Sequence, residues 1–340
     1  MNILRILLFP LAVIYGFITS IRNFLFDQGL LKSTSFAVPV IAVGNLSVGG
    51  TGKTPQIEYL IRLLNQQYRV ATLSRGYKRK SKGFVLADKT SNAAILGDEP
   101  FQYHQKFPNI KVAVDANRTR GIQELLKTQR PPEVILLDDA FQHRKVKADL
   151  YILLTTYTDL YCDDFMLPTG NLRESRSGAN RANIVIVTKC PPSLPIDEQT
   201  IIKNRLGLKA NQHLFFAAIA YDDAVYSESK HISVAEIRKQ EKVLLAGIAK
   251  PEPFFTFLKN NTDPILTFPD HHHFAESEIT AIKAKANQKL IITTEKDYVR
   301  IQSEFPADQL FYLPIQTAFI NNETVFKELI SDFVSDFYAK

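Results

Sequence analysis

Eleven residues, from Gly44 to Thr54, have the types and spacing needed to hold the phosphates of a nucleotide. Small residues let backbone N–H groups close around phosphate oxygens at the start of a helix, where the helix dipole favours an anion. Lys53 would then reach the β- and γ-phosphates, and the Thr54 hydroxyl would hold Mg²⁺. We therefore predict an ATP site formed by Ser47, Val48, Gly49, Gly50, Thr51, Gly52, Lys53 and Thr54.

The residues around this loop support that interpretation. An apolar run, 38–43, precedes it and predicts a strand, and residues 56–64 follow with a helical pattern. Ser47 stands where the usual motif has a glycine. The alternative is a tight turn that happens to carry a lysine, but the strand and helix on either side favour a nucleotide site.

A second strong signal is a pair of aspartates, Asp138 and Asp139, at the end of the apolar run 134–137, which follows Glu133. Such a run is typical of a central strand buried on both faces, and an aspartate at its end is where phosphate-loop enzymes hold Mg²⁺. Neighbouring residues of a strand point to opposite faces, so one aspartate would hold the water shell of the metal and the other would support the metal or a basic partner. The predicted metal ligands are Thr54, Asp138 and Asp139.

Basic and polar residues follow other predicted strands. Arg75 and Tyr77 begin a loop, 75–82, that carries five basic residues and no acid, and Arg118 follows the strand 110–114. Ligands of open α/β sheets bind at the carboxyl ends of strands, so we expect these residues to bind an anionic substrate. A solvated basic loop is the alternative. Asn171 and Arg173, in the loop 167–174, are further substrate candidates, against the alternative of an ordinary surface turn.

Asp98 opens a predicted helix that runs to about residue 107. Its carboxylate could cap the helix, which is the commoner role, or accept a proton as a catalytic base. A run of three histidines, 271–273, follows a later strand and suggests a metal site. Adjacent histidines converge poorly on one ion, however, so packing or surface roles, or one histidine paired with a carboxylate, are the alternatives.

The alternation of strands and helices predicts a doubly wound, mostly parallel α/β/α sheet over residues 36–190. A proline-rich break at 191–195 and a further helix lead to a boundary near residue 211. The second half repeats the alternation on a smaller scale. We expect an N-terminal membrane-associating helix in 1–35, a phosphate-loop nucleotide-binding domain in 36–210 and a smaller α/β domain in 211–340.

Composition limits the class of protein. The chain has 340 residues, 45% hydrophobic and 22% charged, a net charge of +6 and a pI near 9.1. These values are typical of a globular protein with an anionic ligand or an anionic lipid surface. No recognisable nucleic-acid-binding module is present, so we expect no nucleic-acid partner. Two cysteines without metal-ligand spacing suit a reducing cytosol.

The N-terminus is apolar and uncharged from Ile6 to Thr19 and is rich in aromatic residues. This stretch falls short of the roughly 20 residues that span a bilayer comfortably, and no clear signal cleavage site follows it. An interfacial helix on the inner leaflet is the favoured interpretation, with a buried core helix as the alternative.

Taken together, these motifs resemble those of the lipid A 4′-kinase family, the tetraacyldisaccharide 4′-kinases. The resemblance covers essentially the whole chain, with the motifs in the family's order. They are the loop 44–55, the segments 74–77, 97–100, 138–143 and 167–174, Gly247-Ile248 with Pro251, Asp270-His271-His272, and Glu295-Lys296-Asp297. Ser47 is normal for this family, whereas Ala140 replaces a common glycine.

The resemblance implies two α/β/α domains joined by a β-ribbon. It implies transfer of the γ-phosphate of ATP, with Mg²⁺, to the 4′-hydroxyl of an acylated glucosamine disaccharide 1-phosphate on the cytoplasmic face of the bacterial inner membrane. Asp98 would pair with His271 as the general base, which makes capping secondary, and the domains would close before chemistry. We expect a monomer.

The chief alternative is a membrane-recruited ATPase switch of the ParA/MinD type that binds a protein partner. That group carries a signature lysine where this chain has Val48, which argues against it.

Overall fold

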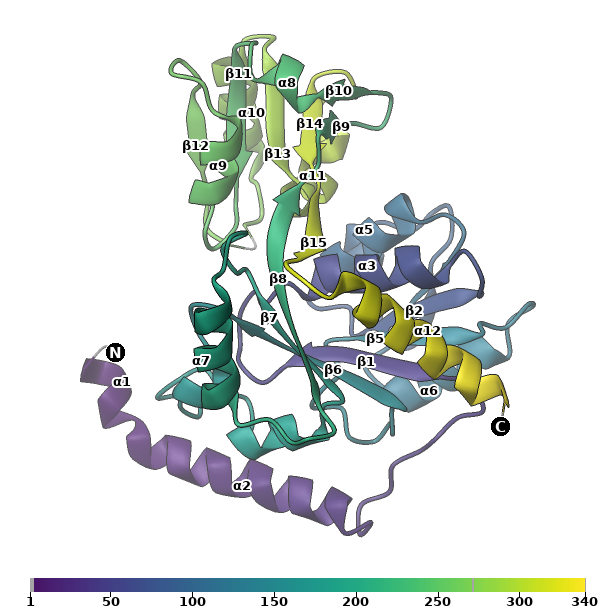
Figure 1. Ribbon diagram of the computed structural model, residues 1–340. Coiled ribbons are helices and arrows are strands. Elements are labelled where there is room, and N and C mark those ends of the chain that lie inside the picture. Colours follow the sequence, from purple (N-terminus) through teal and green to yellow (C-terminus); the bar gives the residue numbers. More distant parts are fainter. Residues whose placement is uncertain (1–2, 271, 340) are drawn as a thin grey trace.

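The computed structural model describes residues 3–270 and 272–339 and shows two lobes, each built on its own sheet (Figure 1). The sheet of the larger lobe has nine strands in the order β15-β8-β7-β6-β1-β5-β2-β4-β3. The strands from β8 to β4 in this order are parallel, and the two edge strands, β15 and β3, are antiparallel to their neighbours. The strand bounds are β1 (Val40–Asn45), β2 (Val70–Ser74), β3 (Val85–Leu86), β4 (Lys111–Val114), β5 (Val134–Asp138), β6 (Leu150–Thr156), β7 (Ile184–Thr188), β8 (His213–Tyr221) and β15 (Ile315–Phe319).

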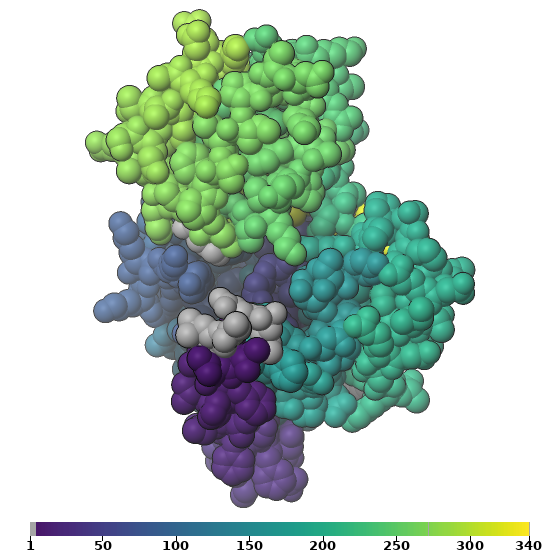
Figure 2. Space-filling model, turned by 90° about the vertical axis from the view of Figure 1, so that its left-hand side faces the viewer, coloured from purple at the N-terminus to yellow at the C-terminus, as the bar shows by residue number. Residues whose placement is uncertain are grey.

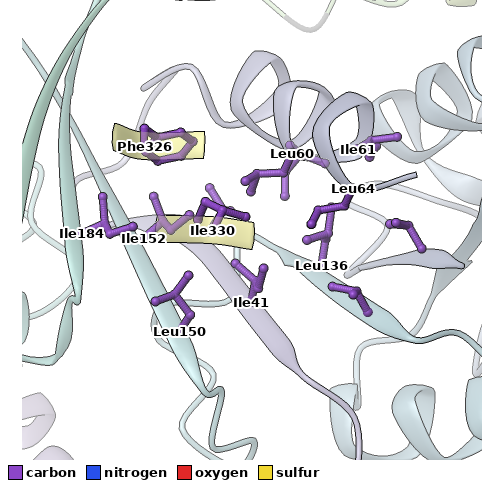
Figure 3. Close-up of a cluster of buried hydrophobic side chains, with 14 of the residues drawn as sticks. Ile41, Leu60, Ile61, Leu64, Leu136, Leu150, Ile152, Ile184, Phe326 and Ile330 are labelled. Carbon is purple, nitrogen blue, oxygen red and sulfur yellow. The ribbon is translucent and has the colours of Figure 1, made fainter. Parts of the chain in front are cut away.

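Helices cover both faces of this sheet, as a buried parallel sheet requires. One face packs against α3 (Lys53–Leu64), α5 (Asp98–Lys106) and α12 (Glu323–Ala339), and the other against α6 (Arg118–Leu126) and α7 (Ile196–Leu206). Alternate residues of each strand supply the two cores: Ile41 faces α3 and α12, whereas Ala42 faces α6. Figure 3 shows side chains from α3 and α12 meeting over β1, β5 and β6. The predicted doubly wound fold is confirmed.

The smaller lobe holds a six-stranded sheet in the order β10-β9-β14-β13-β11-β12, of which β14, β13, β11 and β12 are parallel. Its elements are β9 (Ala224–Tyr226), β10 (His231–Ser233), α8 (Val234–Ile237), β11 (Lys242–Ala246), α9 (Glu252–Leu258), β12 (Ile265–Thr267), α10 (Glu276–Ala286), β13 (Leu290–Thr294), α11 (Glu295–Ile301) and β14 (Leu310–Leu313). The short antiparallel strands β9 and β10 have no counterpart among the predicted elements.

Two antiparallel strands connect the lobes. β8 and β15 pair from Ile315 opposite Tyr221 to Phe319 opposite Ala217, and they rise from the larger lobe into the smaller one (Figure 1). This pair is the expected β-ribbon. Both strands belong to the larger sheet, and α12 packs beneath it, although 211–340 was expected to form the smaller domain. The chain therefore enters the smaller lobe after β8 and returns at β15, so α12 completes a core that begins some 280 residues earlier.

The N-terminus forms α1 (Ile3–Leu7) and α2 (Phe9–Asp27), which lie along the outside of the larger lobe (Figures 1 and 2). Pro10 sits in the first turn of α2, where the missing N–H leaves no hydrogen bond unmade. α2 is long and apolar enough to cross a membrane, and only 11% of its apolar window is buried. The low burial excludes the alternative of a buried core helix.

Candidate active site

The predicted phosphate loop connects β1 to α3, and glycines shape it. Gly49 and Gly52 have φ of 114° and 84°, a left-handed backbone that residues with a Cβ rarely adopt. α3 begins at Lys53, so its unpaired N–H groups open into the loop. The loop is anchored from β7, because the Thr188 hydroxyl donates to the Thr51 carbonyl at 2.8 Å. Lys53 Nζ lies 3.5 Å from Asn45 Oδ1, at the mouth of the loop.

Asp138 and Asp139 lie beside this loop in different environments. Asp138 is the last residue of β5 and is 7% exposed, whereas Asp139 leaves the strand with a φ of 48° and a side chain 40% exposed. Burial, reinforced by the charge of Asp139, raises the pKa of Asp138 to about 6. Burial also disfavours ionisation of Asp139, but the nearby Lys53 and Arg173 outweigh it and lower its pKa to about 2.

The residues present fit a divalent cation at Asp138. Its carboxylate accepts from the hydroxyls of Ser74, at 3.3 Å, and Tyr103, at 3.5 Å. Within the described residues it has no ion pair, so a buried negative charge is left without a counter-ion, which is costly unless a cation binds. Thr54 belongs to the same cluster, because its side chain is hydrogen-bonded to Tyr103. Oxygen ligands of this kind suit Mg²⁺.

Arg118 and Arg75 bring positive charge to the same edge of the sheet. Arg118, the first residue of α6, is 3% exposed, and its Nη1 donates to the carbonyl of Asp115 at 3.2 Å. Burial lowers its pKa to about 10, with Asp138 and Asp139 opposing the effect and Arg75 adding to it. Its guanidinium Nε is buried and has no hydrogen-bond partner among the described residues. An unpaired buried donor near the carboxylates suits an anionic ligand.

The loop 167–174 lies directly against the phosphate loop. The Val48 N–H donates to the Asn171 carbonyl at 2.8 Å, and the Arg173 N–H donates to the Leu46 carbonyl at 2.8 Å. The guanidinium of Arg173 bonds Asp139 at 2.9 and 3.2 Å and also contacts Asn45. The structure thus brings Asn171 and Arg173 to the nucleotide site, where Arg173 is engaged by protein groups. Tyr77 lies in the exposed loop after β2 and is 59% exposed.

Asp98 does not cap its helix, so the capping interpretation is wrong. The N-cap is Gly97, with a φ of 91°, and Asp98 is the first helical residue, where a negative charge still suits the helix dipole. Its carboxylate instead meets the smaller lobe, where Arg300 of α11 donates to it through Nε at 3.0 Å and also through Nη2. The paired base expected at His271 falls outside the described residues.

The neighbouring histidine of the predicted cluster has a structural role. His272 Nε2 lies 2.8 Å from the Glu278 carboxylate, and its ring stacks on Phe268 with centroids 5.0 Å apart. Among the residues that the structure describes, no group of three histidine, cysteine or acidic side chains could hold a metal ion. These contacts favour the packing interpretation for His272.

Two polar networks near the site were not predicted from the sequence. Glu174 is fully buried and accepts from Arg181 at 2.8 and 2.9 Å, from Gln142 at 2.8 Å and from Asn23 of α2 at 2.7 Å, which ties the N-terminal helix to the site. Glu174 lies inside a motif, but nothing in its spacing indicated these partners.

The second network joins the lobes. Lys106 at the end of α5 bridges Glu58 of α3, at 2.7 Å, and Glu295 of α11, at 2.5 Å. Both carboxylates are buried. The only sequence signal was that Glu295 belongs to a recognised motif.

A glycine-rich loop between a central parallel strand and a helix, beside a buried aspartate on the next strand, defines the class of phosphate-loop α/β nucleotide-binding proteins. The family described as tetraacyldisaccharide-1-P 4′-kinase matches residues 4–335, so the chain belongs to this family. A tetraacyldisaccharide 4′-kinase of Flavobacterium johnsoniae is 65% identical over 99% of both chains, and one of Bacteroides thetaiotaomicron is 48% identical over 93% of this chain and 89% of the relative.

A solved structure is similar along the whole length. LpxK from Aquifex aeolicus, in complex with ATP, superposes with a TM-score of 0.79 at 31% identity, covering 98% of this chain and 100% of that one. The expected family and fold are confirmed, and the ATPase switch of the ParA/MinD type is not supported as the function.

Proposed function

We propose that the protein transfers the γ-phosphate of ATP to the 4′-hydroxyl of a tetraacyl glucosamine disaccharide 1-phosphate, a step of lipid A biosynthesis. The observation that carries the proposal is an intact phosphate loop beside the buried Asp138, in a chain that belongs to the 4′-kinase family. Relatives named for this activity cover nearly the whole chain.

The roles of the residues follow from charge and position. Lys53 and the loop N–H groups would hold the β- and γ-phosphates, and Thr54 and Asp138 would bind Mg²⁺, which neutralises developing charge on the phosphates. Arg118 and Arg75 add positive charge on the side where the acceptor would bind. As the acceptor oxygen bonds to the γ-phosphorus and the bond to the leaving ADP oxygen breaks, Asp98 would take the hydroxyl proton, paired with His271.

The acceptor is a lipid, and α2 offers a surface to reach it. The exposed large hydrophobic residues of the chain concentrate there, including Phe9, Leu11, Ile14, Phe17 and Phe24, each more than half exposed. The opposite face of α2 is joined to the site through Asn23. We infer a peripheral, monomeric enzyme on the cytoplasmic face of the inner membrane.

The test is an ATP-dependent phosphotransfer assay on the disaccharide 1-phosphate lipid with wild type, Lys53→Ala and Asp98→Ala. We expect wild-type transfer, a loss of at least about 100-fold in Lys53→Ala, and a similar fall in kcat in Asp98→Ala without weaker ATP binding. ATP hydrolysis without lipid phosphorylation would instead support the ATPase switch. Full activity in Asp98→Ala would remove this residue from the role of base.

A further inference from the structure

Lys189 lies against the phosphate loop, on the side of β1 where β6 and β7 pair. It directly follows β7, and a methyl group placed on Gly50 would lie 3.9 Å from Lys189 Nζ. The preceding residue, Thr188, also contacts the loop, because its hydroxyl donates to the Thr51 carbonyl. The end of β7 is therefore built against the phosphate loop.

The backbone of Lys189 is strained in a way that recurs at this edge of the sheet. Its φ of 56° lies in the left-handed region, as does the φ of 48° at Asp139 after β5. A left-handed conformation is unfavourable for a residue with a Cβ, and such residues gather at functional sites. Lys189 and Asp139 end two strands on opposite sides of β1.

The charges around Lys189 indicate an anionic ligand. Within residues 3–270 and 272–339 its ammonium makes no hydrogen bond or ion pair. Burial lowers its pKa, the positive charge of Lys250 in the smaller lobe lowers it further, and Asp159 and Asp270 act in the opposite direction. Lys250 Nζ itself lies 4.0 Å from Asp159 Oδ2. Two cations from different lobes therefore face one space beside the phosphate loop.

The sheet order decides which part of ATP reaches this space. The metal candidate Asp138 ends β5, next to β1 on one side, so the β- and γ-phosphates must lie toward that side. β6 and β7 lie on the other side of β1. A nucleotide whose phosphates occupy the loop must then extend its nucleoside toward the end of β7, where Lys189 lies.

We propose that Lys189 binds the nucleoside end of ATP, with its ammonium donating to the α-phosphate or ribose oxygens and its alkyl stem packed against the ribose and base. The proposal rests on the proposed use of ATP as phosphate donor. It adds a nucleotide-binding residue outside the loop that the motif defines.

The test compares KM for ATP with the inhibition constant of inorganic pyrophosphate, supplied with Mg²⁺ as a competitor that lacks both the nucleoside and the α-phosphate and whose two phosphates bind in the loop. Lys189→Asn removes the charge but keeps a residue that tolerates a left-handed backbone, and Lys189→Arg restores the charge. Arg130→Asn is the matched control, because Arg130 has a φ of 55°, is exposed and precedes β5 at the opposite edge of the sheet.

We expect Lys189→Asn to raise KM for ATP about tenfold, with kcat, KM for the lipid and the pyrophosphate inhibition constant within about twofold of wild type. Lys189→Arg should recover most of the ATP affinity, and Arg130→Asn should match wild type. An unchanged KM for ATP in Lys189→Asn, or an equal loss of pyrophosphate inhibition, would overturn the proposal. Failure of wild type to phosphorylate the lipid would instead count against the proposed function.

Discussion

At the scale of single residues, the two aspartates at the end of β5 have different tasks although they are adjacent. Lys53 and Arg173 neutralise the charge of Asp139, so its carboxylate attracts a metal ion only weakly. Asp138 is buried with hydroxyl partners alone among the described residues. We propose from this arrangement that Asp138 binds the metal and that Asp139 supports the two cations.

This assignment predicts unequal responses to Mg²⁺. Asp138→Asn should raise the Mg²⁺ concentration for half-maximal transfer by about tenfold or more, because a carboxylate ligand is lost. Asp139→Asn should change that concentration by less than about threefold while lowering kcat, because Lys53 and Arg173 lose their anchor. Mg²⁺ titrations of the transfer rate distinguish the two variants, and equal shifts would contradict the assignment.

At the scale of elements, α2 has two faces with different partners. One face is polar and bonded to the larger lobe, through Asn23 to Glu174 and through the Tyr15 hydroxyl to the Arg173 carbonyl at 2.9 Å. The other face presents Ile14 and Phe17, exposed by 56% and 67%. An apolar face of this kind suits the interfacial region of a bilayer. Deleting the helix would disturb the site as well as the surface, so point substitutions are the cleaner test.

Membrane binding should depend on the exposed face of α2 alone. The double variant Ile14→Glu with Phe17→Glu should bind anionic phospholipid vesicles at least several-fold more weakly, because two charges would enter the apolar layer. Ile196→Glu on α7 is the matched control, since Ile196 is 76% exposed on another surface. Co-sedimentation with vesicles measures the difference, and equal binding by both variants would exclude α2 as the membrane contact.

The junction of α3, α5 and α11 predicts a dependence of stability on pH. Burial, with the charge of Glu58 adding to it and Lys106 opposing, raises the pKa of Glu295 to about 7. A folded-state pKa above the unfolded value means that the folded protein holds the proton more tightly. The contribution of this group to the free energy of unfolding is therefore largest below about pH 4.5 and falls as pH rises toward 7.

Glu295→Gln should remove this decline. As the pH rises from 5 to 8, the free energy of unfolding of the variant should increase relative to that of wild type by on the order of 1 to 3 kcal/mol, at 1.36 kcal/mol per pKa unit. Denaturant unfolding at both pH values measures the change. Parallel curves for the two proteins would show that Glu295 keeps an ordinary pKa.

At the scale of the whole molecule, the proposed site is divided between two lobes. The phosphate loop and Asp98 belong to the larger lobe, whereas Arg300 and Lys250 come from the smaller one. The ribbon of β8 and β15 joins the lobes (Figure 1). The buried contacts of Lys106 join them as well. Such a connection allows the lobes to close on a nucleotide while remaining joined.

Closure should be measurable in solution. A non-hydrolysable ATP analogue with Mg²⁺ should lower the radius of gyration in small-angle X-ray scattering, because its phosphates draw the cations of the smaller lobe toward the loop. Lys53→Ala should show no decrease at the same analogue concentration. An unchanged radius in wild type under saturating analogue would exclude closure as a response to nucleotide alone.

Much of this architecture could be predicted because it depends on local sequence. The phosphate loop, the parallel strands and the aspartates after β5 are specified by glycine spacing, short apolar runs and strand ends, whose conformations depend on neighbouring residues. Tertiary structure alone decided that β8, β15 and α12 complete the larger sheet, that Arg300 binds Asp98 and that Lys189 lies against Gly50. Each of these joins residues far apart in the chain, and such contacts depend on packing between elements that no local pattern encodes.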